Sequence, residues 1–360
     1  MDTIDENINY ANTLNGDFYN SNDQFENSKE NIFAKSWQLV CDDSNLSQSN
    51  FKKPFIYLNE FISEQLLIVN NNQIFKCYSN VCTHRGNILI DKPCKAKEIT
   101  CKYHGRRFNC KGEFIFMPEF KEVKNFPLKK ENLSEIPLNR WRQFLFCSLN
   151  PKINFKSLIQ DMEKRIGWMP IEKFQFDSES SKDYYVNANW ALYCDNYLEG
   201  FHIPFVHEDL NKALDYGKYK TEIYDHANLQ IGYSEGADEV FELPQDHPDY
   251  GENVAAYYYW IFPNMMFNFY PWGLSINIVK PVGLNKTKVS FITYVYDESK
   301  LNTGAGALLE KVEREDEFVV EGVHKGVKSR FYKTGRFSPT KEKGVHQFHS
   351  LLAKFLNEEG

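Results

Sequence analysis

Short runs of β-forming residues separated by polar turns dominate residues 37–150. Runs of this length, bounded by turn residues, are typical of a small antiparallel β domain. The preceding residues, 1–36, are rich in Asn and Asp and weakly patterned, so they are expected to form a separate N-terminal segment. The clearest β-forming runs are 65–69, 73–78 and 143–147.

Longer helical and strand-like segments follow in residues 151–360, which predicts a second, larger domain against which segment 1–36 packs. The expected fold class is α+β, with the small antiparallel β domain followed by a helix-grip-like domain, a twisted antiparallel sheet flanked by helices. Ser338 followed by Pro339 is typical of a helix start. Expected helices are 158–166, 189–202, 307–328 and 339–357, and expected strands are 182–190 and several within 220–296.

Two mixed Cys/His pairs lie within the small domain, Cys82-Thr-His84-Arg-Gly86 and Cys101-Lys-Tyr-His104-Gly105. Zinc sites more often keep their cysteines together and their histidines together. Mixed pairs suit a [2Fe–2S] cluster in which two cysteines hold one iron and two histidines hold the other. A glycine beside each pair permits the tight turns that such loops require. A structural zinc site and chance clustering are the alternatives.

Residues 195–207 carry a second set of potential ligands, because Glu199 precedes His202 by three and His207 follows it by five. On a helix, Glu199 and His202 share one face. Pro204 is expected to end that helix and to turn His207 back toward His202. Two histidines placed in this way are two of the three ligands of a non-haem Fe(II) facial triad. Two structural histidines near a helix end are the alternative.

Asp316 supplies the carboxylate that such a triad needs. It lies on an apolar stripe of the expected helix 307–328, four residues after Val312 and three before Val319. A carboxylate on a buried face is costly unless it is paired or binds a metal, so metal ligation and an internal salt bridge are the two interpretations. The neighbouring glutamates of this helix, Glu313, Glu315, Glu317 and Glu321, are expected at the sides of the stripe or behind it.

These motifs resemble those of the Rieske non-haem iron oxygenase α subunits, in the aromatic-ring-hydroxylating dioxygenase family. The two Cys/His loops look like the cluster loops of Rieske proteins, but Asn87 and Tyr103 occupy positions where respiratory Rieske proteins have disulfide-forming cysteines. The C-terminal segments 335–339 and 344–349 are similar to the choline monooxygenase-like branch.

By this resemblance, Cys82, His84, Cys101 and His104 bind the [2Fe–2S] cluster, and His202, His207 and Asp316 bind the mononuclear Fe(II). The carboxylate that links the two centres is an aspartate in many family members, and here Glu199 occupies its position, with Asp195 as the reserve candidate. The resemblance also implies a homotrimer. Electrons from NAD(P)H are expected to arrive through a separate flavin or iron–sulfur reductase, with or without a ferredoxin.

Composition and charge narrow the remaining possibilities. A net charge of −7 and the absence of a long Lys/Arg block argue against nucleic-acid binding. No apolar stretch is long enough to span a membrane, and the acidic start is unlike a secretory signal, so a cytoplasmic location is expected. No glycine-rich dinucleotide fingerprint is present, which agrees with a separate reductase.

The resemblance predicts that the protein hydroxylates a small organic substrate with O2, with a methylated or quaternary amine as the expected class. An aromatic ring is the alternative substrate, and a Rieske electron carrier without oxygenase activity is the alternative from another class. A cation–π cage for an ammonium group is one interpretation of the aromatic residues in the strands, and sheet core is the other. These aromatics are Tyr257, Tyr258, Tyr259, Trp260, Phe267, Phe269, Tyr270 and Trp272.

Overall fold

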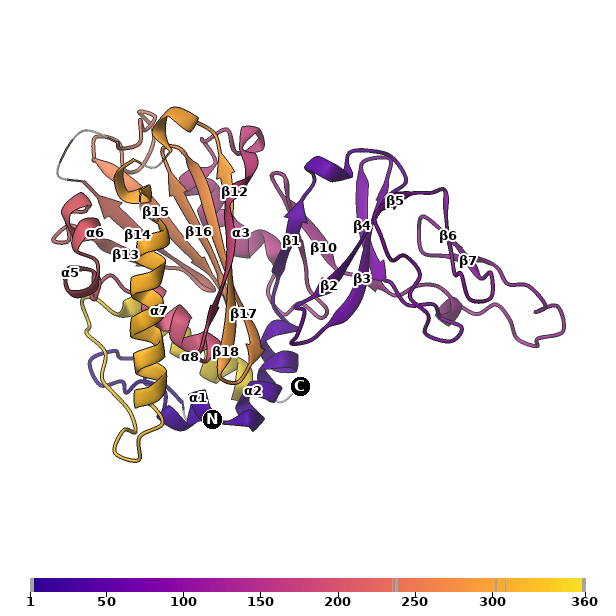
Figure 1. Ribbon diagram of the computed structural model, residues 1–360, viewed down its shortest axis with the longest axis horizontal. Helices are drawn as coiled ribbons and strands as arrows, with labels where there is room; N and C mark the ends of the chain where they lie inside the picture. Colours follow the sequence, from indigo (N-terminus) through magenta and orange to yellow (C-terminus); the bar gives the residue numbers. More distant parts are fainter. Residues whose placement is uncertain (1–2, 235, 237–238, 302, 308, 358–360) are drawn as a thin grey trace. The chain divides into compact units, whose positions relative to one another are not determined.

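The computed structural model describes residues 3–234, 236, 239–301, 303–307 and 309–357, and they form two compact units (Figure 1). The small unit comprises residues 34–152. The large unit comprises the described residues of 1–33 and 153–360. The N-terminal segment therefore belongs to the large unit, although the whole small unit separates the two in sequence.

Three antiparallel sheets make up the small unit, with strand orders β5-β2-β3-β4-β9, β1-β11-β10 and β6-β7-β8. Its core includes Leu67, Val69, Ile99 and Phe108 together with the two cysteines of the predicted cluster loops. The strands are β1 (Gln38–Asp42), β2 (Phe51–Tyr57), β3 (Glu64–Asn71), β4 (Ile74–Ser79), β5 (Cys94–Lys95), β6 (Glu98–Thr100), β7 (Arg107–Asn109), β8 (Phe114–Phe116), β9 (Glu135–Ile136), β10 (Leu138–Trp141) and β11 (Phe144–Cys147).

A single seven-stranded antiparallel sheet forms the centre of the large unit, with the order β12-β18-β17-β16-β15-β14-β13. Helices flank this sheet, so the predicted α+β fold class is confirmed. The strands are β12 (Gln175–Val186), β13 (Lys220–Ile223), β14 (Ala227–Tyr233), β15 (Val254–Ile261), β16 (Met265–Tyr270), β17 (Gly273–Gly283) and β18 (Lys286–Val295).

The longest helix, α7, crosses the sheet in the foreground of Figure 1 and contacts α4 and β12. The N-terminal segment is tied to the C-terminal region of the same unit, because Asn12 forms a β-bridge with Arg336 and the backbone N–H of Leu14 donates to His349. The α-helices are α1 (Gly16–Asn20), α2 (Asn22–Ser28), α3 (Phe155–Ile166), α4 (Trp190–Tyr197), α5 (Ile203–Val206), α6 (Glu208–Ala213), α7 (Leu309–Gly326) and α8 (Lys343–Asn357).

Several predicted boundaries are wrong for local reasons. Ser338 and Pro339 form a turn before α8, in which the backbone N–H groups of Lys341 and Glu342 donate to Ser338, so the helix begins only at Lys343. The strand predicted at 182–190 is the longer β12, because its pairing with β18 continues to Gln175. Helix 307–328 is observed as α7, and Leu308 lies outside the described residues.

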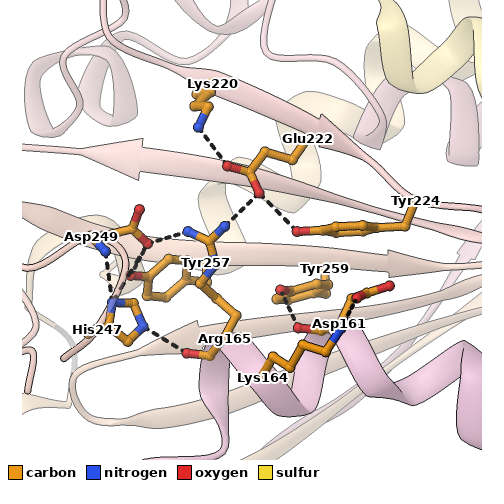
Figure 2. Close-up of polar contacts among 10 residues, drawn as sticks. All are labelled: Asp161, Lys164, Arg165, Lys220, Glu222, Tyr224, His247, Asp249, Tyr257 and Tyr259. Atoms are coloured by element: carbon orange, nitrogen blue, oxygen red, sulfur yellow. Dashed lines mark hydrogen bonds and ion pairs between the residues drawn. The ribbon is translucent and has the colours of Figure 1, made fainter.

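Side chains of β15 alternate between the two faces of the sheet. Tyr257 and Tyr259 point to the α3 side, where their hydroxyls donate to Asp249 and to the backbone carbonyl of Asp161. Figure 2 shows this side, with Arg165 of α3 held between Asp249 and Glu222. The buried charges there are paired, which is the arrangement that makes them tolerable inside a protein.

Within the described residues, no helix combines the length and the apolar character needed to cross a membrane.

Candidate metal centres and substrate cavity

The two predicted cluster loops repeat one backbone pattern. The N–H of Cys82 donates to the carbonyl of Asn87, and the N–H of Cys101 donates to that of Arg106, with both N···O distances 2.8 Å. In each loop the glycine N–H donates back to the cysteine carbonyl, and Gly86 and Gly105 have φ of 70° and 73°. This left-handed conformation suits glycine, so the sequence requires glycine at these two positions for a backbone reason.

The four predicted cluster donors meet at the tips of these loops. Cys82 and Cys101 are buried and their thiol groups contact each other, whereas His84 and His104 are half-buried with ring centroids 4.9 Å apart. Two thiols on the inner side and two imidazoles on the outer side match the donor set of a [2Fe–2S] cluster with cysteines on one iron and histidines on the other. The residues present therefore fit this cluster.

Asn87 and Tyr103, which replace the cysteines of respiratory Rieske proteins, both contact the site. The Asn87 side-chain amide donates to Cys101 Sγ over 3.7 Å, and the Tyr103 ring lies over His104 with a centroid distance of 3.6 Å. Hydrogen bonds to the sulfur atoms are one of the means by which a protein sets a cluster's reduction potential.

In the large unit, His202 and His207 lie at the two ends of the short helix α5. The prediction that Glu199 and His202 share one helix is wrong, because α4 ends at Tyr197 and Pro204 lies in the first turn of α5. Proline is tolerated in a first turn, where its missing N–H has no partner in any case. The chain turns between α4 and α5 instead, and this turn still brings Glu199 against His202.

His202, His207 and Asp316 converge as predicted, and one ligand atom from each lies within 4.8 Å of the others. Asp316 Oδ1 is 3.0 Å from His207 Nε2 and 3.6 Å from His202 Nε2. The ion pairs of Asp316 among the described residues are with these two imidazoles and not with a lysine or arginine, a surrounding that suits metal ligation.

A further carboxylate holds each histidine from behind. Glu199 Oε1 is 2.7 Å from His202 Nδ1, and Glu315 Oε2 is 2.7 Å from His207 Nδ1. With Nδ1 donating to a carboxylate, Nε2 is left as the metal ligand, and the ring is fixed in orientation. The sequence did not reveal the part played by Glu315, because its partner His207 is 108 positions away.

The electrostatics of this set favour a bound cation. Burial by itself lowers the pKa of His207, but its hydrogen bonds with Asp316 and Glu315 more than offset that effect and raise the pKa above its ordinary value. The site thus stabilises positive charge between its carboxylates. A donor set of two imidazoles and one carboxylate is the facial triad that binds non-haem Fe(II), and the residues present fit this ion.

Asp195, the reserve candidate for the bridge, has other partners. Its carboxylate accepts from the Tyr19 hydroxyl at 2.7 Å and lies 2.9 Å from His349 Nε2. The carboxylate bonded to His202 is that of Glu199.

The buried face of α7 differs from the predicted apolar stripe. Val323 is exposed, while Glu313 is only 3 % exposed and lies on the inner face one turn before Asp316. The Tyr193 hydroxyl donates to Glu313 Oε2. Burial raises the pKa of Glu313 to about 8, and the charges of Asp316 and Glu317 act in the same direction. A helical pattern alone does not distinguish a buried glutamate from an exposed one, so this residue was missed.

A cavity of about 110 Å³ opens beside the triad. Of the eight aromatics considered for a cage, Tyr258 and Tyr270 line it, and Trp272 lines an adjoining cavity. Tyr257, Tyr259, Phe267 and Phe269 face the opposite side of the sheet, because alternate residues of a strand face opposite ways. Trp260 packs against Phe348 of α8. Polar side chains of the same sheet, those of Gln230, Asn268, Ser275 and Asn277, also line the cavity.

Comparison with known proteins places this arrangement in a family. Residues 172–358, more than half of the chain, match the family described as ring hydroxylating alpha subunit (catalytic domain). The chain belongs to this family. Residues 36–127 match the Rieske [2Fe-2S] domain. The protein is therefore a Rieske oxygenase α subunit, an oxidoreductase whose family uses a [2Fe–2S] cluster and a mononuclear iron.

Individual relatives agree with this assignment. The chain is 28 % identical to the carnitine monooxygenase oxygenase subunit of Escherichia coli K12, covering 96 % of this chain and 94 % of that protein. It is 26 % identical to the chloroplastic choline monooxygenase of Beta vulgaris, covering 92 % and 74 %. A solved quaternary ammonium Rieske monooxygenase, 25 % identical, matches with a TM-score of 0.75 over 96 % of both chains.

The structure of naphthalene 1,2-dioxygenase from Rhodococcus, at 16 % identity and a TM-score of 0.72, shares the fold of this Rieske oxygenase α subunit over 97 % of this chain and 95 % of that one. The predicted family is confirmed, and the interpretation as an electron carrier without a catalytic domain is wrong, because the catalytic-domain match spans residues 172–358.

Proposed function

We propose that this Rieske oxygenase hydroxylates a methylated or quaternary ammonium compound. The proposal is carried by the lining of the cavity beside His202, His207 and Asp316. Aromatic rings contribute to this lining, and its charged side chains among the described residues, apart from the two histidines, are all carboxylates. Such a lining suits an organic cation, whereas an arene is best served by an apolar pocket. The names of the carnitine and choline monooxygenases among its relatives support the same class.

In this proposal, Cys82, His84, Cys101 and His104 hold the [2Fe–2S] cluster, and His202, His207 and Asp316 hold Fe(II). When bound, the cluster supplies single electrons and the iron activates O2. Glu199 and Glu315 keep the two imidazoles in the tautomer and orientation needed for ligation. The aromatic side chains exclude water from the substrate.

Glu199 is also the proposed link between the two centres, in preference to Asp195. Its Oε1 is the hydrogen-bond partner of the ligand His202, and its Oε2 accepts the backbone N–H groups of Phe201 and His202. These three hydrogen bonds fix the carboxylate of Glu199 against the ligand His202. Asp195 is instead engaged with Tyr19 and His349.

The proposal includes a separate reductase that draws electrons from NAD(P)H and a homotrimer, both of which follow from the family resemblance. It includes a cytoplasmic location, which the six free cysteines other than Cys82 and Cys101 support, because a reducing compartment keeps thiols unpaired.

The test is metal analysis followed by product analysis. We expect about three irons and two acid-labile sulfides per chain if the centres are as proposed. With a Rieske-oxygenase reductase and NAD(P)H, oxygen uptake should yield product from choline, carnitine or another methylated amine. Product from arenes alone would contradict the proposal, and so would an iron content of two per chain after full reconstitution.

A further inference from the structure

Glu313 lies where two cavities of the large unit meet. It lines the cavity of about 110 Å³ that holds the triad and also the adjoining cavity of about 420 Å³. Ser275, Phe291 and Leu309 are likewise shared by both linings. A ligand that occupies the triad cavity and extends into the larger one must therefore pass Glu313.

The bonding of Glu313 is incomplete. Oε2 accepts from the Tyr193 hydroxyl, but Oε1 is buried and has no hydrogen-bond partner among the described residues. The neighbouring Arg314 is exposed and pairs with Glu317 at 2.9 Å, and its charge only partly offsets the effect of burial on the pKa of Glu313. Without a ligand, burial keeps a proton on this carboxyl by raising its pKa to about 8, and a cation bound at Oε1 favours the ionised form and completes its bonding.

Acidic side chains line both cavities, and neither cavity has an unpaired basic side chain among its described lining residues. In the triad cavity, Glu199, Glu313 and Asp316 are the carboxylates, and no lysine or arginine is among the described lining residues. In the larger cavity, Lys182 is the basic side chain among the described lining residues, and it is paired with Glu310 at 2.7 Å. The carboxylates of these cavities complement a cationic group of a ligand. The carboxylate of a betaine, by contrast, has no unpaired lysine or arginine to bind among these lining residues.

We infer that Glu313 is the anchor for the ammonium group of the substrate, and that the substrate is a cation whose remaining part is uncharged, such as an alkylammonium or an amino alcohol. This inference rests on the proposed function and adds the specificity residue to it. Glu313 and Asp316 are three residues apart on α7, which places their Cβ atoms about 5–6 Å from each other. An anchored ammonium therefore presents its methyl or adjacent methylene carbon to the triad. Tyr193 is a positioning residue that holds the carboxylate.

Binding to the iron-loaded holoenzyme tests this directly. Calorimetric titration should compare choline with 3,3-dimethylbutan-1-ol, its uncharged isostere in which carbon replaces nitrogen. In Glu313→Gln we expect choline affinity to fall by about tenfold or more, while affinity for the isostere changes by less than about threefold, because only the cation loses its counter-charge. Glu321→Gln is the matched control, since Glu321 is on the same helix but bonds Asn187. Its affinities should equal those of the wild type.

Tyr193→Phe provides a second variant that keeps the carboxylate. It should lower the affinity for choline by a few-fold and leave the affinity for the isostere unchanged. An equal loss for choline and for the isostere in Glu313→Gln, at unchanged iron content, would mean that Glu313 is structural and would overturn the inference. Unchanged choline affinity would overturn it as well. If Glu313→Gln does not fold, Tyr193→Phe decides by the same comparison of the two ligands.

Wild-type selectivity tests the second half of the inference. Choline should bind at least about tenfold more tightly than glycine betaine or L-carnitine, whose carboxylates find no free cation. L-Carnitine binding as tightly as choline would overturn the expectation of an uncharged remainder. Failure of the proposed function can be distinguished from failure of this inference. If choline binding depends on Glu313 but no amine yields product with the reductase, amine oxidation is refuted and the role of Glu313 in binding is kept.

Discussion

In the small unit, all four candidate cluster donors come from two loops that repeat the same hydrogen bonds within residues 82–106. The candidate iron donors of the large unit, by contrast, are up to 114 positions apart, the separation of His202 and Asp316. The first site depends on local backbone geometry, above all on two glycines with positive φ. The second depends on contacts between distant segments, because Glu315 and Asp316 of α7 hold His207. A local site survives changes elsewhere in the fold, and a dispersed site is sensitive to the packing of every element that supplies a ligand.

Asp316→Asn should have the largest effect and should separate the two sites. Loss of the charged ligand is expected to remove the mononuclear iron and abolish turnover, while the cluster loops keep their two irons and their visible spectrum. Iron and sulfide analysis together with product formation measures this. Loss of the visible chromophore in Asp316→Asn would show that the two sites are not independent.

Glu199→Gln should have the next largest effect. Removing the charge that orients His202 is expected to lower turnover by about 10- to 100-fold or more, with the cluster still reducible by its donor. Asp195→Asn is the comparison, because Asp195 bonds Tyr19 and His349 instead. Turnover that falls more in Asp195→Asn than in Glu199→Gln would reverse the assignment of the linking carboxylate.

The pH dependence of stability should differ between iron-free wild type and Glu313→Gln. The pKa of Glu313 is about 8 in the folded protein against an ordinary 4.5. Between these values the folded state holds a proton that the unfolded state has released, so stability falls as pH rises from about 5 to 8. The Tm of the wild type should therefore decline more over this range than that of Glu313→Gln. Parallel declines in the two proteins would contradict a buried, protonated Glu313.

The smallest expected effects concern the small unit. Gly86→Ala should lower the free energy of unfolding by about 1–2 kcal/mol. Backbone strain at positive φ is the cause, because the added Cβ meets no neighbouring atom within 4 Å. Gly105→Ala should cost more, since its Cβ would lie 3.3 Å from Pro118 Cγ. The thermal loss of the cluster's visible absorption measures both. Equal midpoints for Gly105→Ala and the wild type would mean that the glycine turns are not what shapes these loops.

This comparison also explains which parts of the sites the sequence predicts. The Cys/His loops are contiguous, so residue spacing alone predicts their four donors. Asp316 could be proposed because a carboxylate on a helical stripe is unusual. Glu315 and Glu313 could not, because their partners His207 and Tyr193 lie 108 and 120 positions away. The end of α4 was also missed, since Pro204 in a first helical turn and Pro204 after a helix look the same in sequence.

The fold was predicted at the level of its class and less well at its boundaries. Short runs of β-forming residues between turn residues are a strong signal for strands, and they predicted the sheets of both units. Alternation of apolar and polar residues could not have marked β14 and β16, which are buried along their whole length. Which face of a strand meets the cavity is set by strand register, and sequence alone does not fix it. Tyr258 therefore reaches the cavity, while Tyr257 and Tyr259 point to the α3 side and are buried there.

The hydrogen bond from Leu14 to His349 joins residues 335 positions apart, and it has a consequence for biosynthesis. On the ribosome, residues 34–152 emerge as one uninterrupted piece and can complete their sheets early. The N-terminal segment emerges first but must remain without its partners until nearly the whole chain has been translated, because non-local contacts form only when both segments exist. Of the two units, the large one is therefore the last to be completed and the more exposed to chaperones and proteases during synthesis.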